Sequence, residues 1–228
     1  QKNPIRLHMP GSKGKVSIPF GFDITEIDGA DFLFSPNGII KESEQNASSL
    51  FNTAATLYST EGSSLCIKTM IALLKKTGIN SILAARNSHM SFLNACILSD
   101  MNVSWIYPDN KISSICSGEY TADLIDSALS KKEIKAVYVT SPDYLGNILN
   151  IKAIAEVCKR HGAYLLVDNA HGAYLKFLAP DLHPISLGAD MCCDSAHKTL
   201  PAMTGGAYLH ISRETDEAFI KNAKSVMS

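Results

Sequence analysis

The feature that most constrains the fold of this chain is the alternation of short apolar runs with longer amphipathic runs. The short runs are typical of buried strands, and the amphipathic segments have the spacing of helices that cover a sheet. Strands are predicted at 81–85, 103–107, 136–141, 163–168, 189–194 and 207–211, and helices at 89–98, 121–130 and 151–160. Alternating units of this kind predict an α/β fold with a mostly parallel sheet that is covered on both faces.

The first part of the chain has a different pattern. Residues 1–40 are rich in Gly and Pro and weakly periodic, which indicates an extended N-terminal arm. Residues 41–228 are expected to form one large domain. It should begin with a helix at about 43–57 and an extended piece at 57–60. The helix that follows should stop at Gly78, because lysines favour the last turn and glycine ends helices.

The composition limits the classes of protein that fit. The 228 residues are 46% hydrophobic and 19% charged, with a formal net charge of −1, so a substantial core is possible and no global charge favours nucleic acid. No apolar run reaches the length of a membrane span, and the first residues lack the apolar core of a signal peptide. The six cysteines show no metal-like spacing, which favours reduced thiols in a cytoplasmic protein.

Polar residues gather directly after the predicted strands. In a parallel sheet, ligands bind beyond the carboxyl ends of the strands. The segments in that position are 60–64, 86–89, 141–146, 168–171 and 194–198. Their coincidence predicts one binding site built from several loops.

Two of these segments carry residues that pyridoxal phosphate (PLP) chemistry needs. Lys198 lies in a Ser-x-His-Lys motif, and Asp168 ends the preceding predicted strand. A lysine forms a Schiff base with the cofactor aldehyde, and a carboxylate keeps the pyridine nitrogen protonated so that the ring accepts electrons. Taken alone, most lysines are surface charges and most strand-end aspartates cap turns. The order of the other elements favours the PLP interpretation.

The remaining candidates would hold the phosphate and the ring. Gly62, Ser63 and Ser64 open a helix, where free N–H groups and two hydroxyls suit a phosphate, although a plain serine cap is the alternative. His89 begins the next helix. Its flat ring is suited to stack on a pyridine ring, and a polar helix-start role is the alternative.

Three further candidates lie in the two motifs that carry Asp168 and Lys198. Ala170 lies two residues after Asp168 and is suited to pack against the ring. Ser195 is a candidate phosphate ligand, and His197 is a candidate phosphate ligand or proton shuttle. In an extended chain Lys198 would point away from Ser195 and His197, so a tight turn is expected here.

These motifs resemble the large domain of the Orn/Lys/Arg decarboxylase family, bacterial fold-type I PLP enzymes that act on basic amino acids. The matching stretches, in family order, are 8–14, 23–26, 62–64, 86–89, 140–146, 167–172 and 195–202. The Ser-x-His-Lys and Asp-x-Ala-His pieces are the specific ones. The motif His-Lys-Thr-Leu-Pro-Ala at 197–202 most resembles that of the shorter arginine, lysine or ornithine decarboxylases of Gram-positive bacteria.

The resemblance implies a cytoplasmic PLP enzyme of polyamine biosynthesis that decarboxylates arginine, lysine or ornithine. It also implies a homodimer or a higher oligomer. By position, Lys198 would form the Schiff base, Asp168 would pair with the pyridinium and His89 would stack on the ring. Lys198 or His197 would return a proton to the substrate. The phosphate would be held by Ser63, Ser64, Ser195 and His197.

The chain also departs from the family pattern. Glu61 and Asp143 stand where the family often has Asn and a hydroxyl residue, and a carboxylate beside a phosphate is unfavourable unless it points away. Ser12 and Asn169 replace residues that are often His and Glu. Family members continue beyond position 228 into a small C-terminal domain, so a fragment or a truncated chain is expected.

Three alternatives remain open on the residues alone. Another fold-type I reaction, such as transamination or β-elimination, uses the same lysine and aspartate. A truncated chain that binds PLP or a partner without turnover belongs to a different class of function. An α/β domain without any cofactor is the third.

Overall fold

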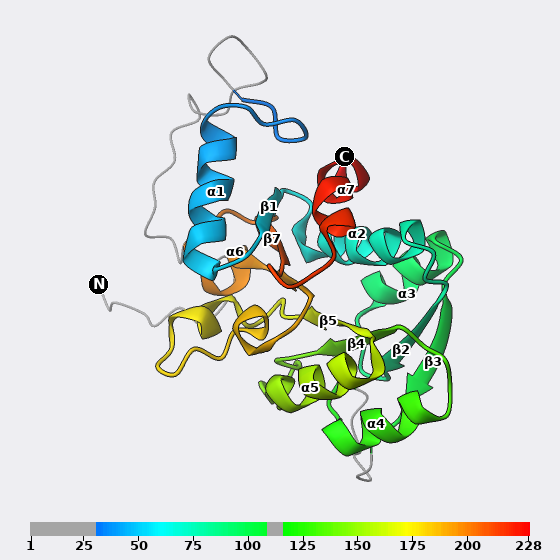
Figure 1. Ribbon diagram of the computed structural model, residues 1–228. Coiled ribbons are helices and arrows are strands. Elements are labelled where there is room, and N and C mark those ends of the chain that lie inside the picture. Colours follow the sequence, from blue (N-terminus) through cyan, green and yellow to red (C-terminus); the bar gives the residue numbers. More distant parts are fainter. Residues whose placement is uncertain (1–30, 109–115) are drawn as a thin grey trace.

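The computed structural model describes residues 31–108 and 116–228, and its centre is a seven-stranded sheet (Figure 1). The strand order is β1-β7-β6-β5-β4-β2-β3. β7 is antiparallel to β6 and β1, whereas the pairs β2–β3, β2–β4, β4–β5 and β5–β6 are parallel. The mostly parallel α/β sheet is thereby confirmed. The strands are Ala55–Ser59 (β1), Ser81–Ala85 (β2), Asn102–Ile106 (β3), Ala136–Thr140 (β4), Tyr164–Asp168 (β5), Met191–Asp194 (β6) and Ala207–Ile211 (β7).

Helices cover both faces of the sheet, as predicted (Figure 1). One face carries α2 (Gly62–Lys76), α3 (Met90–Leu98) and α7 (Glu217–Met227). The other carries α4 (Ala122–Ser130) and α5 (Ile151–His161). Helix α1 (Ile39–Phe51) lies beside the edge strand β1. The short elements are η2 (Ala173–Phe177), η3 (Pro184–Leu187) and α6 (Ala196–Thr199).

The sheet separates two apolar cores, because side chains alternate between the two faces of a strand. On β4, Tyr138 faces the layer of α2, α3 and α7, whereas Val137 and Val139 face α4 and α5. Strands that are buried on both faces need apolar residues at every position. This requirement explains why the sequence shows continuous apolar runs rather than strict alternation.

The first elements differ from the sequence prediction. The helix expected at 43–57 spans Ile39–Phe51, and residues 55–59 form β1 instead. Asn52 adopts the left-handed conformation with φ 56° and ends the helix, and the residues after it pair with β7. The helix begins early because the Asp31 carboxylate accepts hydrogen bonds from backbone N–H groups at its start, those of Gly38, Ile40 and Lys41.

The later boundaries agree closely with the prediction. The strands predicted at 103–107 and 189–194 are Asn102–Ile106 and Met191–Asp194, and both lie within two residues of the expected bounds. Most of the expected N-terminal arm at 1–40 falls on residues 1–30, which lie outside the described ranges. Within those ranges, the helices are all too short or too polar to cross a bilayer.

A glycine contact joins the start of α2 to the loop before β7. The Gly62 N–H donates to the Gly205 carbonyl at 2.8 Å. Gly205 has φ +92°, and a Cβ there would lie 2.5 Å from the Thr60 carbonyl oxygen. Only glycine therefore lets these two loops approach so closely.

Replacing Gly205 with alanine should destabilise the fold more than the same change at a matched glycine. Gly78 has a similar φ of +88° but open space around its Cβ position. Gly78→Ala should cost about 1–2 kcal/mol from the left-handed backbone alone. Gly205→Ala should cost about 1–3 kcal/mol more, because the Thr60 carbonyl must also move. Urea denaturation measures both values, and equal losses would contradict the close contact.

Candidate active site

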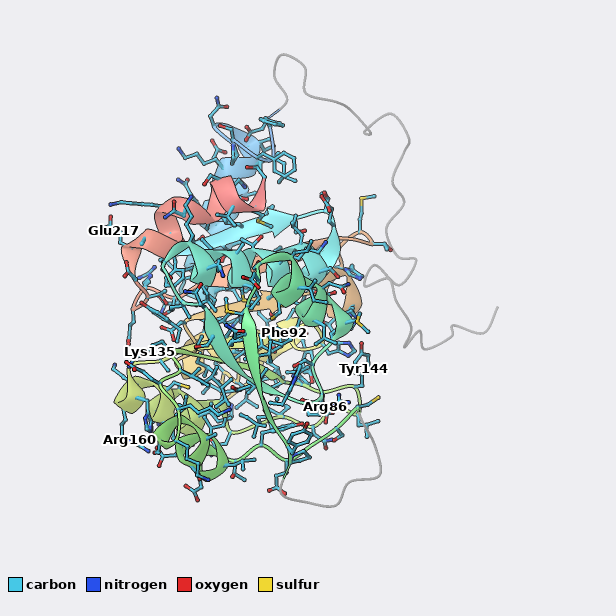
Figure 2. All side chains as sticks on the ribbon, turned by 90° about the vertical axis from the view of Figure 1, so that its right-hand side faces the viewer. Arg86, Phe92, Lys135, Tyr144, Arg160 and Glu217 are labelled. Atoms are coloured by element: carbon cyan, nitrogen blue, oxygen red, sulfur yellow. The ribbon has the colours of Figure 1, made fainter. Side chains whose placement is uncertain are left out.

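Loops from several strands meet at the carboxyl edge of the sheet. Figure 2 shows Arg86 and Tyr144, which follow β2 and β4, on one side of the molecule and Lys135, which precedes β4, on the other. The pocket at this edge has about 370 Å³ of space inside and in front of it. Its walls include five of the predicted residues, which are Ser63, His89, Asp168, Ala170 and Lys198. Thr140, Pro142, Tyr144 and His171 complete the lining.

Lys198 lies on the one-turn helix α6 and lines the pocket. The expected tight turn is α6, in which the Lys198 N–H donates to the Ser195 carbonyl at 3.0 Å. The turn breaks the alternation that would have pointed Lys198 away from the other candidates. Burial lowers the pKa of the Lys198 side chain, and the nearby Asp168 carboxylate offsets only part of this effect. A neutral, nucleophilic amine is therefore more accessible than on an exposed lysine.

His171 contacts this lysine directly. Its Nε2 lies 2.9 Å from Lys198 Nζ, and its ring lies edge-on to Tyr144. Burial and the charge of Lys198 lower the pKa of His171, so a neutral imidazole can accept the hydrogen bond from the lysine. The two groups form a pair through which a proton can pass.

Asp168 is held in place by three donors, of which the Cys193 thiol is the most distant, at 3.6 Å from Oδ1. The side chain is 3% exposed, and its Oδ1 accepts from the Ala170 N–H at 3.2 Å. Its Oδ2 accepts from the Tyr138 hydroxyl at 3.1 Å. Burial and the Asp168 charge raise the pKa of Tyr138 well above its usual value, so the hydroxyl remains a donor. The carboxylate thus faces the pocket from a fixed orientation.

Tyr138 was missed by the sequence reasoning. It lies in the middle of a strand that is buried at every position, and its ring stacks on Phe92 at a centroid distance of 4.1 Å. Phe92, labelled in Figure 2, is fully buried on α3. A buried tyrosine hydroxyl needs a hydrogen-bond partner. That need was the available signal, but the partner could not be named without the strand order.

Serine hydroxyls gather where α2 begins. Gly62 starts the helix with φ +71°, and Ser63 lines the pocket. Ser195 Oγ donates to Ser63 Oγ at 2.9 Å, whereas Ser64 Oγ lies 2.7 Å from Ser91 Oγ. The first turn of a helix also offers N–H groups without helical acceptors and the positive end of its dipole. This end of the pocket is suited to an anion.

The two remaining histidine candidates take different positions. His89 lines the pocket and also caps α3, because its Nδ1 accepts from the Ser91 N–H at 3.1 Å. The cap and the pocket wall are therefore compatible roles for one ring. His197 lies outside the pocket lining, and its Nδ1 donates to the Gly206 carbonyl at 3.0 Å. That bond leaves Nε2 as the nitrogen available for a phosphate or a proton.

The two unexpected carboxylates do not line the pocket. Glu61 is exposed at the residue before α2. Asp143 is buried, and its Oδ1 accepts from the N–H groups of Leu145 and Asn147 at 2.9 and 3.0 Å. Burial opposes its charge, but hydrogen bonds from Ser117 and Asn147 lower the pKa of Asp143 overall. The Asp143 carboxylate therefore stabilises the turn at residues 143–147.

Removing the Tyr138 hydroxyl should destabilise the protein, because the Asp168 carboxylate loses a buried donor. We expect Tyr138→Phe to lower the free energy of unfolding by about 1–3 kcal/mol in urea denaturation. Tyr164→Phe is the matched control, since this ring packs on Phe219 at a distance from the pocket. A loss no larger than that of the control would show that the bond to Asp168 contributes nothing.

Lys198 should react as an amine at a lower pH than an ordinary lysine, because only the neutral form is nucleophilic. The lowered pKa moves the neutral form to lower pH. The measurement is the rate of acetylation of Lys198, followed by peptide mapping across a pH series. The midpoint should lie below that of free Nα-acetyl-lysine. Restricted access would reduce the plateau rate without moving the midpoint, and a midpoint at or above the reference would contradict the prediction.

The amino-acid sequence matches a known protein family and several curated relatives. The family model described as Orn/Lys/Arg decarboxylase, major domain, matches residues 18–227. The uncharacterized protein YaaO of Bacillus subtilis is 34% identical over 226 residues, which are 93% of this chain and 46% of the relative. An arginine decarboxylase of Halalkalibacterium halodurans is 31% identical over 223 residues, 92% of this chain and 45% of the relative. The chain spans about half the length of these curated relatives.

A structural comparison agrees with this assignment. The crystal structure of Oryza sativa TDC with PLP and tryptamine matches with a TM-score of 0.64 at 15% identity, over 80% of this chain and 43% of that chain. At this identity the likeness shows the fold alone, which is that of the fold-type I large domain. The family model covers nearly the whole chain. The chain therefore belongs to the Orn/Lys/Arg decarboxylase family and corresponds to its major domain.

Proposed function

We propose that this chain is the PLP-binding domain of an enzyme that decarboxylates arginine, lysine or ornithine to the corresponding amine. The observation that carries the proposal is the pocket shared by the Lys198 amine and the buried Asp168 carboxylate. Family membership and the named arginine decarboxylase support a basic amino acid as the substrate.

The residues present fit PLP. Lys198 suits the aldehyde, Asp168 suits the ring nitrogen, and the hydroxyls of Ser63 and Ser195 suit the phosphate. Thr140 Oγ1 supports the fit further, because it is buried without a hydrogen-bond partner and its residue lines the pocket. A polar ligand atom would supply the missing partner. When bound, PLP supplies an electron sink for the electron pair that stays at Cα when CO₂ departs.

The chain's own groups then have distinct tasks. Lys198 would bind the aldehyde as a neutral amine, and it can exchange a proton with His171 at 2.9 Å. Asp168, oriented by Tyr138, would hold a proton at the ring nitrogen. His89, which lines the pocket, would pack against the ring. Lys198 would return a proton to Cα, with the His197 imidazole as the alternative donor.

We propose further that the enzyme acts in the cytoplasm as a homodimer or higher oligomer. The loop beside the pocket supports association, since Tyr144, Leu145 and Ile148 are 52%, 66% and 44% exposed. Neighbouring apolar side chains of this size favour burial against another protein surface. A second copy of the chain would cover them and shield the pocket.

Replacing Lys198 should abolish imine formation with PLP. The purified protein is mixed with PLP, its absorbance spectrum is recorded, and borohydride reduction followed by peptide mapping locates the label. We expect the label on Lys198 in the parent protein and no imine band in Lys198→Ala. Lys152→Ala, an exposed lysine on α5, is the control and should keep the band. An unchanged spectrum in Lys198→Ala would refute the assignment.

Asp168→Asn should separate cofactor binding from turnover. The variant should keep part of its PLP but lose most CO₂ release, because the amide cannot hold the ring nitrogen protonated. CO₂ release is measured with arginine, lysine and ornithine in turn. Near-normal rates in Asp168→Asn would contradict this role. A parent protein that binds PLP on Lys198 but releases CO₂ from none of the three would refute the decarboxylase and leave the cofactor site standing.

A further inference from the structure

A second polar group lies on the other face of the sheet, away from the pocket. Cys192 and Asp194 are two residues apart on β6 and point to one face, which is the face of α4 and α5. His210 on β7 is the register partner of Cys192, and His183 enters from the residue before η3. All four side chains are 0% exposed.

The four donor atoms converge on one point. His183 Nε2 and His210 Nε2 each lie 3.1 Å from Asp194 Oδ2, and Cys192 Sγ lies 3.9 Å from His183 Nε2. All the donor atoms lie within 4.8 Å of one another. Metal–ligand bonds of about 2.0–2.3 Å give a tetrahedron with edges of roughly 3.3–3.6 Å. The printed contacts of 3.1 and 3.9 Å lie within a few tenths of an ångström of these edges, and the widest separation of up to 4.8 Å would have to close by about 1 Å to complete a tetrahedral site.

The surroundings have the features of a closed metal site. Thr56 Oγ1 lies 2.9 Å from His210 Nδ1, and the Asn169 amide donates to Asp194 Oδ1 at 2.6 Å. Such outer partners fix the tautomer of a ligating histidine and the orientation of a ligating carboxylate. Phe51 packs against both imidazoles, with ring centroids 5.1 Å from His183 and 4.4 Å from His210. This apolar wall separates the group from water.

Charge and ligand type favour zinc. Two neutral imidazoles, one thiolate and one carboxylate carry two negative charges, which a divalent ion neutralises in a site without water. Mixed nitrogen, sulfur and oxygen ligands in a tetrahedron suit Zn²⁺ better than Mg²⁺ or Ca²⁺, which prefer oxygen ligands. A set of four protein ligands leaves no open position for a substrate or water, so the role would be structural.

We propose that His183, Cys192, Asp194 and His210 bind a structural zinc ion behind the cofactor pocket. The ion would link β6, β7 and the loop before η3. It would also support both motifs of the pocket, because Asn169 follows Asp168 and Asp194 precedes Ser195. Since the ligands are enclosed, the metal would enter while the chain folds.

Cys192 separates this proposal from a purely hydrogen-bonded group. Without a metal, Asp194 accepts hydrogen bonds from His183, His210 and Asn169, and the thiol at 3.9 Å contributes little. With a metal, the thiolate is a ligand. Cys192→Ala should therefore affect metal binding strongly if the proposal holds, and it should have no such effect if only hydrogen bonds are present. Cys158→Ala is the matched control, since this buried thiol lies on α5 outside the group.

The experiment measures metal content and cobalt spectra in three proteins. The parent chain, Cys192→Ala and Cys158→Ala are produced with added zinc, purified without chelator and analysed by plasma mass spectrometry. The parent and Cys158→Ala should hold stoichiometric zinc and lose thermal stability with a chelator. Refolding them with Co²⁺ should give tetrahedral d–d bands and a thiolate-to-cobalt charge-transfer band. Cys192→Ala should lose the charge-transfer band and bind Co²⁺ at least about tenfold more weakly, since losing even an outer-shell partner of a metal ligand costs about that much.

Two results would overturn the proposal. One is a parent protein that holds no stoichiometric zinc and shows no cobalt spectrum after refolding. The other is Cys192→Ala that binds metal as tightly as Cys158→Ala while both keep the same circular dichroism spectrum. If Cys192→Ala does not fold, Cys192→Ser provides the test, because its weaker oxygen ligand should still remove the charge-transfer band. These readouts need no PLP, so their failure is distinct from failure of the proposed function.

Discussion

The burial of both faces of the sheet is the constraint on which the rest of the structure depends. Helices cover the sheet from two sides, so a polar side chain within a strand is removed from water and needs a partner. Polar groups therefore occur at strand ends, as Asp168 and Asp194 do, or in pairs, as Tyr138 does with Asp168. The groups that line the pocket lie at the carboxyl edge, because a polar side chain inside a strand needs a buried partner.

The ends of β5 and β6 carry two polar groups on opposite faces. Asp168 faces the pocket side with Tyr138 and Lys198, whereas Asp194 faces the side of α4 and α5 with His183 and His210. Members of the two groups are adjacent along the chain. Asn169 directly follows Asp168, and Ser195 directly follows Asp194. The Asn169 amide, which donates to Asp194 Oδ1, is the direct contact between the two groups.

The sequence allowed the strands and the central pair of the site to be predicted, because both depend on local patterns. Apolar runs mark buried strands, and Asp168 and Lys198 each follow such a run. Tyr138 and His183 could not be assigned, since their partners depend on which strands are neighbours. The group of His183, Cys192, Asp194 and His210 could not be predicted from the sequence for the same reason. These residues are 9, 2 and 16 positions apart, and this spacing matches no known metal-binding motif. The error at 43–57 arose because nothing in the periodicity marks Asn52 as a left-handed residue.

One departure from the family pattern, Asn169, contacts Asp194 directly. The family often has Glu where this chain has Asn169, and here the Asn169 amide donates to Asp194 Oδ1 at 2.6 Å. A carboxylate at position 169 would stand beside the Asp194 carboxylate in a site without water, where like charges repel strongly. An amide instead supplies a donor at no charge. Asn169 and Asp194 are thus compatible as a pair in this chain.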